Sequence, residues 1–264
     1  MSQLRYDREA SRRLERAYTT RDVQSQRDEV RRSLAAAPGE RILDLGSGPG
    51  ILACELAAEI GPGGRVTAVD VSEEMNLIAS RRIVEVGLAR QVDVALADAV
   101  ALPFPDASFD AAVATQVIEY VDNVEAALLE VRRVLRPGGR LVLLDTEWET
   151  LIWSSSDEVR RARILAAWSA HAAHPSLPRI LTRRLRTAGF VVDELRVIPL
   201  LNTSYSEQTY SYNLAALIAD FVKNGESLPS EDVEAWLADL SELDETAAYF
   251  FSLNRYLFHA TRMA

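Results

Sequence analysis

The sequence is poor in cysteine and in long apolar runs. Cys54 is the one cysteine among 264 residues, so no disulfide can form within the chain. No apolar run approaches the roughly 18 residues that a membrane-spanning helix needs. The charged stretch from Met1 to Arg16 lacks the apolar segment of a secretory signal. We therefore expect a cytoplasmic protein without a membrane partner, in which Cys54 is a small apolar residue on a helix.

Positive charge is also scarce, and nearly all of it is arginine. The chain has 29 basic and 39 acidic residues, which gives a formal net charge of −10. A nucleic-acid partner needs a basic face, so this balance argues against one. Hydrophobic residues make up 48% of the chain and charged residues 26%, which is typical of a globular protein. The length allows one large α/β domain or two small ones.

A glycine-rich segment follows the first apolar run of the chain. Residues 42–50 are Ile-Leu-Asp-Leu-Gly-Ser-Gly-Pro-Gly, and residues 51–60 have helical spacing. Glycine lacks a Cβ, so the backbone can turn sharply and approach a ligand closely. The helix that follows begins with unpaired N–H groups. The pattern predicts a strand, a tight turn and a helix that together bind a nucleotide.

Strand and helix signals then alternate. We expect strands over 41–45, 65–70, 91–95, 109–115 and 140–144, and helices over 50–60, 72–86 and 123–135. This alternation implies a parallel sheet with helices on both faces. Ligands of such sheets bind beyond the carboxyl ends of the strands. Polar side chains occur at those positions: Asp44, Asp70, Asp98, Gln116 and Asp145.

The flanking segments are less regular. A helix is expected over 7–36, and residues 146–175 are aromatic-rich and in part helical. Further elements are a helix over 179–188, a strand over 190–200, helices over 213–222 and 231–243, and a final strand over 248–261. Because no repeat or linker is present, one domain over 1–264 is favoured. It has an N-terminal helical cap (1–36) and two insertions that cover the substrate (146–178 and 202–246).

The spacing Gly46-x-Gly48-x-Gly50 is one residue shorter than the G-x-G-x-x-G of dinucleotide sites. Four further motifs follow it: Val-Asp-Val-Ser at 69–72, Ala-Asp-Ala at 97–99, Phe-Asp-Ala at 109–111 and Leu-Arg-Pro-Gly-Gly at 135–139. In order and spacing, residues 38–145 resemble the class I S-adenosylmethionine-dependent methyltransferases. The resemblance is to the small-molecule group that includes the ubiquinone/menaquinone methyltransferases.

This resemblance implies a fold and a reaction. The fold is α/β, with a Rossmann-like, mostly parallel seven-stranded sheet, helices on both faces, and an N-terminal helical cap and helical insertions over the active site. The reaction is an SN2 displacement that moves a methyl group from S-adenosyl-L-methionine to an O, N or C atom of a small organic acceptor. An enzyme of this kind mainly aligns the nucleophile, the methyl group and the sulfur.

The resemblance also implies cofactor contacts. Asp70 would accept from two ribose hydroxyls, although it could instead cap the next helix, a role that Ser72 can also supply. Asp98 would accept from the adenine amino group, Asp44 would orient the turn or meet the methionine ammonium, and Met75 would pack on adenine or in the core. The full expected set is Asp44, Gly46, Ser47, Gly48, Gly50, Asp70, Val71, Met75, Asp98, Ala99 and Gln116.

The acceptor side is less determined. Tyr120 stands near the position where this family often carries a base, and His171 and His174 are spaced to share one helix face. These three residues are candidates to orient or deprotonate the acceptor. We expect no metal site, because no cysteine and no clear third ligand accompany the histidines.

Five further residues are candidate contacts of a planar or partly apolar acceptor, with core packing as the alternative. They are Tyr18, Arg27, Trp148, Trp153 and Tyr205. The covering segments could also form an oligomer contact.

Other functions stay open at this point. A member of the same family could bind the cofactor and catalyse cyclisation or decarboxylation, or it could be a non-catalytic partner subunit. The short glycine spacing disfavours a nicotinamide dehydrogenase, and the negative charge disfavours a nucleic-acid methyltransferase.

Overall fold

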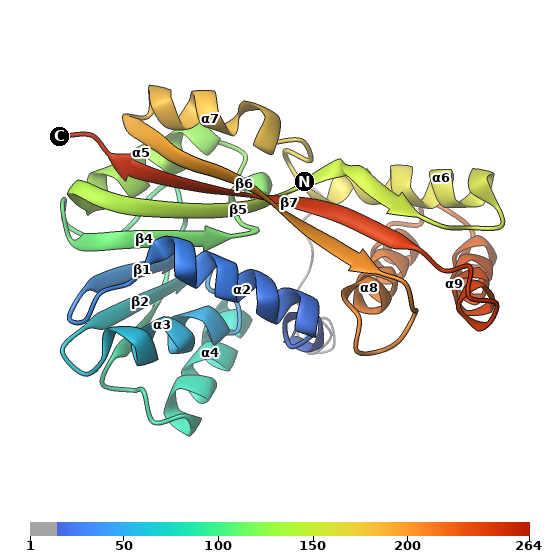
Figure 1. The fold of residues 1–264 in the computed structure, drawn as a ribbon, viewed down its shortest axis with the longest axis horizontal. Coiled ribbons are helices and arrows are strands. Elements are labelled where there is room, and N and C mark those ends of the chain that lie inside the picture. The colour runs from blue at the N-terminus through green and yellow to red at the C-terminus, as the bar shows by residue number, and fades with distance from the viewer. Residues whose placement is uncertain (1–14) are drawn as a thin grey trace.

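The computed structural model describes residues 15–264 and contains one seven-stranded sheet (Figure 1). Its strand order is β3-β2-β1-β4-β5-β7-β6. The strands are β1 (Arg41–Leu45), β2 (Arg65–Asp70), β3 (Val92–Leu96), β4 (Phe109–Thr115), β5 (Leu135–Trp153), β6 (Phe190–Asn202) and β7 (Phe251–Arg262). The first five pair in parallel, and β7 lies antiparallel between β5 and β6. The predicted mostly parallel seven-stranded α/β fold is confirmed.

Helices cover both faces of the sheet. They are α2 (Arg21–Leu34), α3 (Ile51–Ile60), α4 (Glu73–Glu85), α5 (Val124–Val134), α6 (Glu158–Trp168), α7 (Pro178–Thr187), α8 (Tyr210–Asn224) and α9 (Ser230–Glu245), with the 3-10 helices η1 (Ile118–Tyr120) and η2 (Ser169–His171). One core joins α5 and α7 to the sheet, and a second joins α2, α3 and α4 to the opposite face. Two layers of helices thus bury the parallel strands on both sides.

The predicted helix over 7–36 is interrupted. Residues before 15 lie outside the described part, and α2 begins only at Arg21. The hydroxyls of Thr19 and Thr20 donate to the carbonyl oxygens of Arg16 and Ala17, both at 2.8 Å. Thr20 has an extended backbone (φ −65°, ψ 151°). Such local side-chain bonds compete with helical ones, so the chain turns before α2.

The fifth strand is much longer than predicted. We expected a strand over 140–144 and a partly helical insertion after it, but β5 continues to Trp153. Its second half pairs with β7, and Trp153 lies opposite Phe251. The sequence prediction was wrong here because the strand partners of residues 146, 147, 152 and 153 are about 100 residues further along the chain. A register shift lies between Glu147 and Ile152, where the strand bends.

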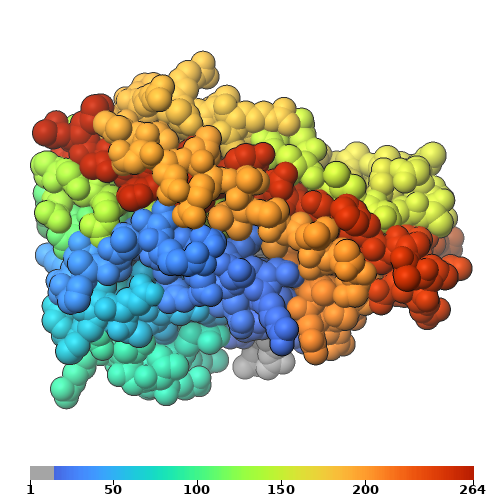
Figure 2. Space-filling model, in the orientation of Figure 1, coloured from blue at the N-terminus to red at the C-terminus, as the bar shows by residue number. Residues whose placement is uncertain are grey.

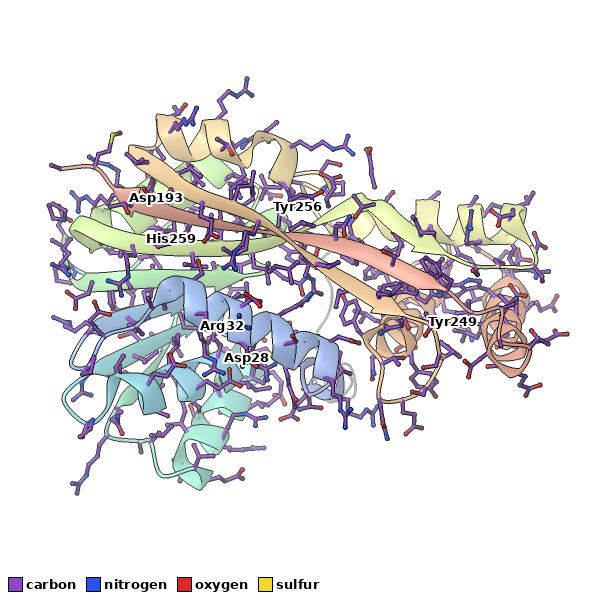
Figure 3. The ribbon with its side chains drawn as sticks, in the orientation of Figure 1. Asp28, Arg32, Asp193, Tyr249, Tyr256 and His259 are labelled. Carbon is purple, nitrogen blue, oxygen red and sulfur yellow. The ribbon has the colours of Figure 1, made fainter. Side chains whose placement is uncertain are left out.

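The long antiparallel strands β5, β6 and β7 extend beyond the parallel sheet, and α6, α8 and α9 pack on this extension (Figure 1). It has its own core, in which Trp153, Trp236 and Phe251 are almost fully buried. The ring centroid of Trp153 lies 5.2 Å from that of Trp236 and 4.8 Å from that of Phe251. We call the ends of β5–β7 together with α6, α8 and α9 the extension. Tyr249 lies there, whereas His259 lies over the body of the sheet (Figure 3).

Helix α2 connects the sheet to the extension. The space-filling view shows α2 against β6 (Figure 2), where Arg196 pairs with Glu29 at 3.1 Å. Further along α2, Asp22 accepts from the backbone N–H of Tyr210, the first residue of α8, at 2.9 Å. Across residues 15–264, no helix combines the length and the apolar composition that crossing a membrane requires.

The separate core of the extension leads to a test. We expect Trp236→Ala to lower the free energy of unfolding by about 3–5 kcal/mol, because a large buried ring is lost. Amide hydrogen exchange then accelerates first in α8 and α9, while β1 and β4 stay protected. Val159→Ala on α6, where the side chain is exposed, is the control and leaves exchange unchanged. Uniform acceleration across the sheet would contradict a separate core.

Candidate cofactor and acceptor site

A cavity lies where the glycine turn faces α2 and the strand ends. Its lining combines apolar side chains, two arginines and the backbone of the turn. The lining residues are Tyr18, Val23, Gln26, Arg27, Val30, Gly46, Ser47, Gly48, Pro49, Ile51, Leu52, Thr115, Gln116, Leu144 and Arg255. They come from α2 and the turn before it, from the glycine turn and the start of α3, from the end of β4 and the residue after it, and from β5 and β7. The cavity therefore lies at the carboxyl ends of the parallel strands, as predicted.

The three glycines of the turn serve different purposes. All have positive φ: +65° at Gly46, +51° at Gly48 and +73° at Gly50. A Cβ at Gly46 would lie 2.2 Å from a methyl carbon of Val117, and one at Gly50 would lie 2.9 Å from the Cβ of Ala79. Gly48 has open space, with Tyr18 at 3.8 Å. Packing thus requires Gly46 and Gly50, whereas Gly48 leaves room for a ligand.

Asp70 at the end of β2 is already bonded to the turn. One carboxylate oxygen accepts from the backbone N–H of Gly48 and the other from that of Ser72, both at 2.9 Å. Ser72 itself caps α4, because its hydroxyl accepts from the backbone N–H of Met75. Asp70 is therefore not the helix cap, and each of its oxygens keeps a lone pair for a further donor.

Asp44 is a buried carboxyl group at the end of β1. It is 1% exposed, and its Oδ2 has no hydrogen-bond partner. Burial raises the pKa of Asp44 to about 8, and the negative charges of Asp70 and Glu55 add to this effect. A buried acceptor oxygen without a donor fits a cationic ligand group such as an ammonium, which would also favour the ionised carboxylate.

Gln116 directly follows β4 and has a strained backbone conformation. Its φ of +56° is unusual for a residue other than glycine. The backbone N–H donates to the Leu144 carbonyl oxygen, and the side-chain amide donates to the Thr146 hydroxyl, both at 2.6 Å. These two bonds to β5 hold the left-handed turn that directs the chain past the cavity.

Several predicted cofactor residues lie outside the cavity lining, namely Asp44, Gly50, Asp70, Val71, Met75, Asp98 and Ala99. Asp98 is exposed, and its Oδ1 accepts from the backbone N–H of Val100 at 3.1 Å. Met75 and Ala99 are buried, and Val71 is 67% exposed. Ser47 lines the cavity, and its buried hydroxyl has no partner.

The sequence analysis missed a buried acidic pair next to the site. Asp145 was noted only as a strand end, and Glu119 in η1 was not singled out, yet both are fully buried. Burial raises the pKa of Asp145 to about 7. Burial also raises the pKa of Glu119, and the negative charge of the nearby Asp145 raises it further. Glu119 accepts from the indole N–H of Trp148 at 2.9 Å. Arg255 acts on both acids and lowers their pKa values.

His171 is enclosed by aromatic rings. It stacks on Trp168 (3.7 Å between centroids), and it meets Trp148 edge-on at 4.5 Å and Tyr120 at 5.9 Å. Its Nδ1 lies 2.7 Å from the Trp168 carbonyl oxygen, and its buried Nε2 has no partner. Burial lowers the pKa of His171 to about 4, so the ring is neutral at pH 7.

The prediction that His171 and His174 share a helix face is wrong. The short helix η2 ends at His171, and Ala172 is extended (φ −110°, ψ 144°), so His174 follows on irregular chain. His174 Nε2 lies 3.2 Å from the Asp122 carbonyl oxygen. The prediction failed because the i, i+3 spacing says nothing about where a short helix ends.

The candidate acceptor contacts fall into two groups. Tyr18 and Arg27 line the cavity, and Arg27 donates to both oxygens of Glu55 at 3.1 Å. Trp148, Trp153 and Tyr205 belong to the extension. Trp153 donates to the Tyr249 hydroxyl at 3.0 Å inside that core. The cavity and the core of the extension adjoin each other, because Val23 belongs to that core, Tyr18 packs against it, and both residues line the cavity.

Comparison with known proteins places the chain in a family. A family model described as a methyltransferase domain matches residues 43–143. An uncharacterized 37.1 kDa protein in transposon TN4556 of Streptomyces fradiae is 34% identical over 247 residues, which cover 92% of this chain and 69% of that protein. The ubiquinone/menaquinone biosynthesis C-methyltransferase UbiE of Cupriavidus taiwanensis is 31% identical over 183 residues, which cover 68% of this chain and 72% of that enzyme.

The chain belongs to the class I S-adenosylmethionine-dependent methyltransferases. Its cofactor is S-adenosylmethionine, and its reaction is methyl transfer. Among solved structures, the [4+2]-cyclase SpnF has the same fold, with a TM-score of 0.61 and 24% identity over 92% of this chain and 81% of that one. The open space at Gly48, the unpartnered oxygen of Asp44 and the remaining lone pairs of Asp70 fit the cofactor of this family.

The glycines of this methyltransferase allow a matched comparison. We expect Gly46→Ala to lower the free energy of unfolding by about 2–4 kcal/mol, because it adds both a left-handed alanine and a clash with Val117. Gly48→Ala adds only the backbone cost of about 1–2 kcal/mol but weakens binding of S-adenosylhomocysteine. Denaturant unfolding and titration calorimetry measure the two effects. Equal stability of the two variants would contradict the packing argument.

Asp44 predicts a pH-dependent stability. Its pKa is higher in the folded state than the usual 3.8, so stability contributed by the protonated form is lost as pH rises toward about 8. Asp44→Asn removes this loss and raises the melting temperature of the cofactor-free protein at pH 8 by about 3 °C or more, with a smaller gain at pH 5. The same variant weakens the binding of S-adenosylhomocysteine.

The control for this experiment is Asp93→Asn, because Asp93 is an exposed acid paired with Arg65. Its melting temperature follows that of the wild type at both pH values. If Asp44→Asn melted below the wild type at pH 8, groups inside the protein would already compensate the cost of burying the Asp44 carboxylate, and the prediction would be wrong.

Proposed function

We propose that this methyltransferase acts on a small, partly apolar or aromatic acceptor that enters the cavity between the glycine turn, α2 and β7. The observation that carries the proposal is the lining, which places apolar side chains such as Val23, Val30 and Leu144 beside polar groups without partners. Pockets of this composition suit small organic molecules. The related UbiE is by name a C-methyltransferase of ubiquinone/menaquinone biosynthesis, which supports an acceptor of this class.

The strand order supports a division of the site into two halves. Asp70 ends β2, the glycine turn follows β1, and Gln116 follows β4, and these three strands are neighbours in the sheet. We assign the cofactor to these strand ends, with Asp70 toward the ribose and Asp44 toward the methionine ammonium. Asp98, Ala99 and Met75, near the ends of β3 and β2, are assigned to the adenine side. When bound, the cofactor supplies an electrophilic methyl group on a sulfonium.

The acceptor half then lies over β4, β5 and β7. An acceptor that must lose a proton needs a base, and His171 is the residue best suited to this role. Because the Trp168 carbonyl can only accept, the ring N–H is on Nδ1, and Nε2 carries a free lone pair. The lowered pKa keeps this nitrogen unprotonated at pH 7. Tyr120 and Trp148 hold the ring from two further sides.

We further propose that the extension covers the acceptor half and acts as its lid or wall. Its support is that α2, which lines the cavity, also contacts α8 through Asp22. A cytoplasmic location is proposed from the single cysteine, which suits a reducing compartment. Exposed apolar residues of β6, among them Leu195 and Val197, support a homo-oligomer contact.

A second function from the same cofactor site is a reaction without methyl transfer. Its support is the shared fold with SpnF, a [4+2]-cyclase by name. The mass of the product separates the two functions, because methyl transfer adds one methyl group and releases S-adenosylhomocysteine, whereas cyclisation leaves the mass unchanged.

The donor half is tested first. We expect titration calorimetry to show binding of S-adenosylhomocysteine, and Asp70→Asn to weaken it by about tenfold or more, because an acceptor for the ribose hydroxyls becomes an amide. Asp93→Asn is again the control and binds normally. Absence of binding to the folded wild type would reject the function, and unchanged affinity of Asp70→Asn would move the ribose site elsewhere.

The acceptor half is tested in the same preparation. A panel of small phenols, quinols and amines is incubated with S-adenosylmethionine, and the release of S-adenosylhomocysteine is measured. For a phenol that reacts, we expect His171→Gln to lose rate near pH 7 and to recover as the pH approaches the phenol's own pKa. A loss that is equal at all pH values would assign His171 a structural role.

A further inference from the structure

Arg255 is a buried cation in the middle of an apolar strand. It lies on β7 opposite Thr146 of β5 and Ile198 of β6, and it is 1% exposed. Its Cζ lies 4.7 Å from the ring centroid of Tyr210. A charged group is rarely buried in a strand of this kind unless a partner compensates the cost of removing it from water.

The partners inside the protein do not complete that compensation. Arg255 Nη1 donates to Oε1 of Gln26, which is a neutral amide. Apart from a side-chain interaction of the guanidinium with the neutral Tyr210 hydroxyl, its Nε and Nη2 have no hydrogen-bond partner, and no carboxylate of residues 15–264 forms an ion pair with it. Glu119 and Asp145 are near enough for Arg255 to lower their pKa values, but burial raises the pKa of both acids and thereby favours their neutral forms.

A second set of unused donors adjoins Arg255. Gln26 is 2% exposed, and its Nε2 also has no partner. Both Arg255 and Gln26 line the cavity. Three buried nitrogens, Nε and Nη2 of Arg255 and Nε2 of Gln26, therefore offer hydrogen atoms and find no acceptor in the described protein. A set that consists only of donors around one positive charge fits an oxyanion such as a carboxylate.

We infer that Arg255 and Gln26 bind an oxyanion, such as a carboxylate, carried by the methyl acceptor. This inference rests on the proposed function and narrows it to anionic acceptors. Arg255 is a binding residue that selects the acceptor, and Gln26 positions the guanidinium of Arg255 through their hydrogen bond.

The strand order identifies the acceptor, rather than the cofactor, as the source of the anion. The cofactor half is assigned to β2, β1 and β4, whereas β7 is separated from β4 by β5. Neighbouring strands lie about 4.8 Å apart, so β7 is about 14 Å from β1. The other arginine of the cavity, Arg27, is already paired with Glu55 of α3, the helix that follows the glycine turn. The methionine carboxylate of the cofactor carries the same chemistry, so the experiment must separate the two sources.

The test uses two probes of nearly equal shape. With S-adenosylhomocysteine saturating, fluorine NMR measures the binding of 4-fluorobenzoate, an anion, and of 4-fluorobenzamide, its neutral counterpart. We expect the wild type to prefer the benzoate by about tenfold or more, because charge-assisted hydrogen bonds form only with the anion. Arg255→Gln removes the preference. Arg196→Gln, on the neighbouring strand and paired with Glu29, keeps it.

A second variant supplies the missing charge from within. Gln26→Glu has nearly the same shape and places a carboxylate beside Arg255. We expect it to abolish the preference for benzoate and to raise the melting temperature by about 2 °C or more, because the internal ion pair replaces the absent anion. Circular dichroism verifies that each variant is folded. The preference of the wild type for benzoate is measured without any variant, so it tests the inference even if a variant fails to fold.

The outcomes separate this inference from the function on which it rests. Preference for benzoate, lost in Arg255→Gln and Gln26→Glu while S-adenosylhomocysteine binds within twofold of wild type, supports it. Equal or absent binding of the two probes by the wild type overturns it, as does a lower melting temperature of Gln26→Glu. If Arg255→Gln loses affinity for S-adenosylhomocysteine tenfold and keeps the benzoate preference, Arg255 binds the cofactor, and this result also overturns the inference. If the wild type binds no S-adenosylhomocysteine, the proposed function itself fails.

Discussion

Antiparallel pairing places β7 between β6 and the part of β5 that begins at Arg140. This pairing gives residues 146, 147, 152 and 153 their partners on β7, and it extends the sheet beyond its parallel part. The register of this pairing also places Arg255 opposite Thr146, where it lines the cavity. The positions of the extension and of the acceptor half both depend on it. The parallel strands β1 to β4 position the glycine turn and the acidic residues at the cofactor half.

The fold around the proposed cofactor half was largely predictable because its signals are local. The glycine turn, Asp44 and Asp70 occur within 30 residues, and their strands and helices have short-range patterns that give their bounds to within a residue or two. The structure adds what spacing does not contain. Gly46 and Gly50 are needed for packing against Val117 and Ala79, so only Gly48 is free to meet a ligand.

The acceptor half was poorly predicted because its contacts are distant in sequence. Glu119 meets Trp148 about 30 residues away, and Gln26 meets Arg255 more than 200 residues away. A signal for Arg255 was present, since it interrupts an alternating apolar strand, and a charge at an inward position of such a strand indicates a buried polar site. The two histidines show the opposite error, in which a local spacing predicted a shared face that the end of η2 prevents.

The extension is connected to the rest of the protein mainly by strand ends and by α2. Its core of tryptophan and phenylalanine side chains is separate from the two cores of the sheet. Substitutions in α6, α8 and α9 can therefore accumulate without altering the register of β1, β2 and β4. With the acceptor half assigned to the extension side as proposed, a scaffold divided in this way allows acceptor contacts to change without altering the strands that hold the proposed donor half.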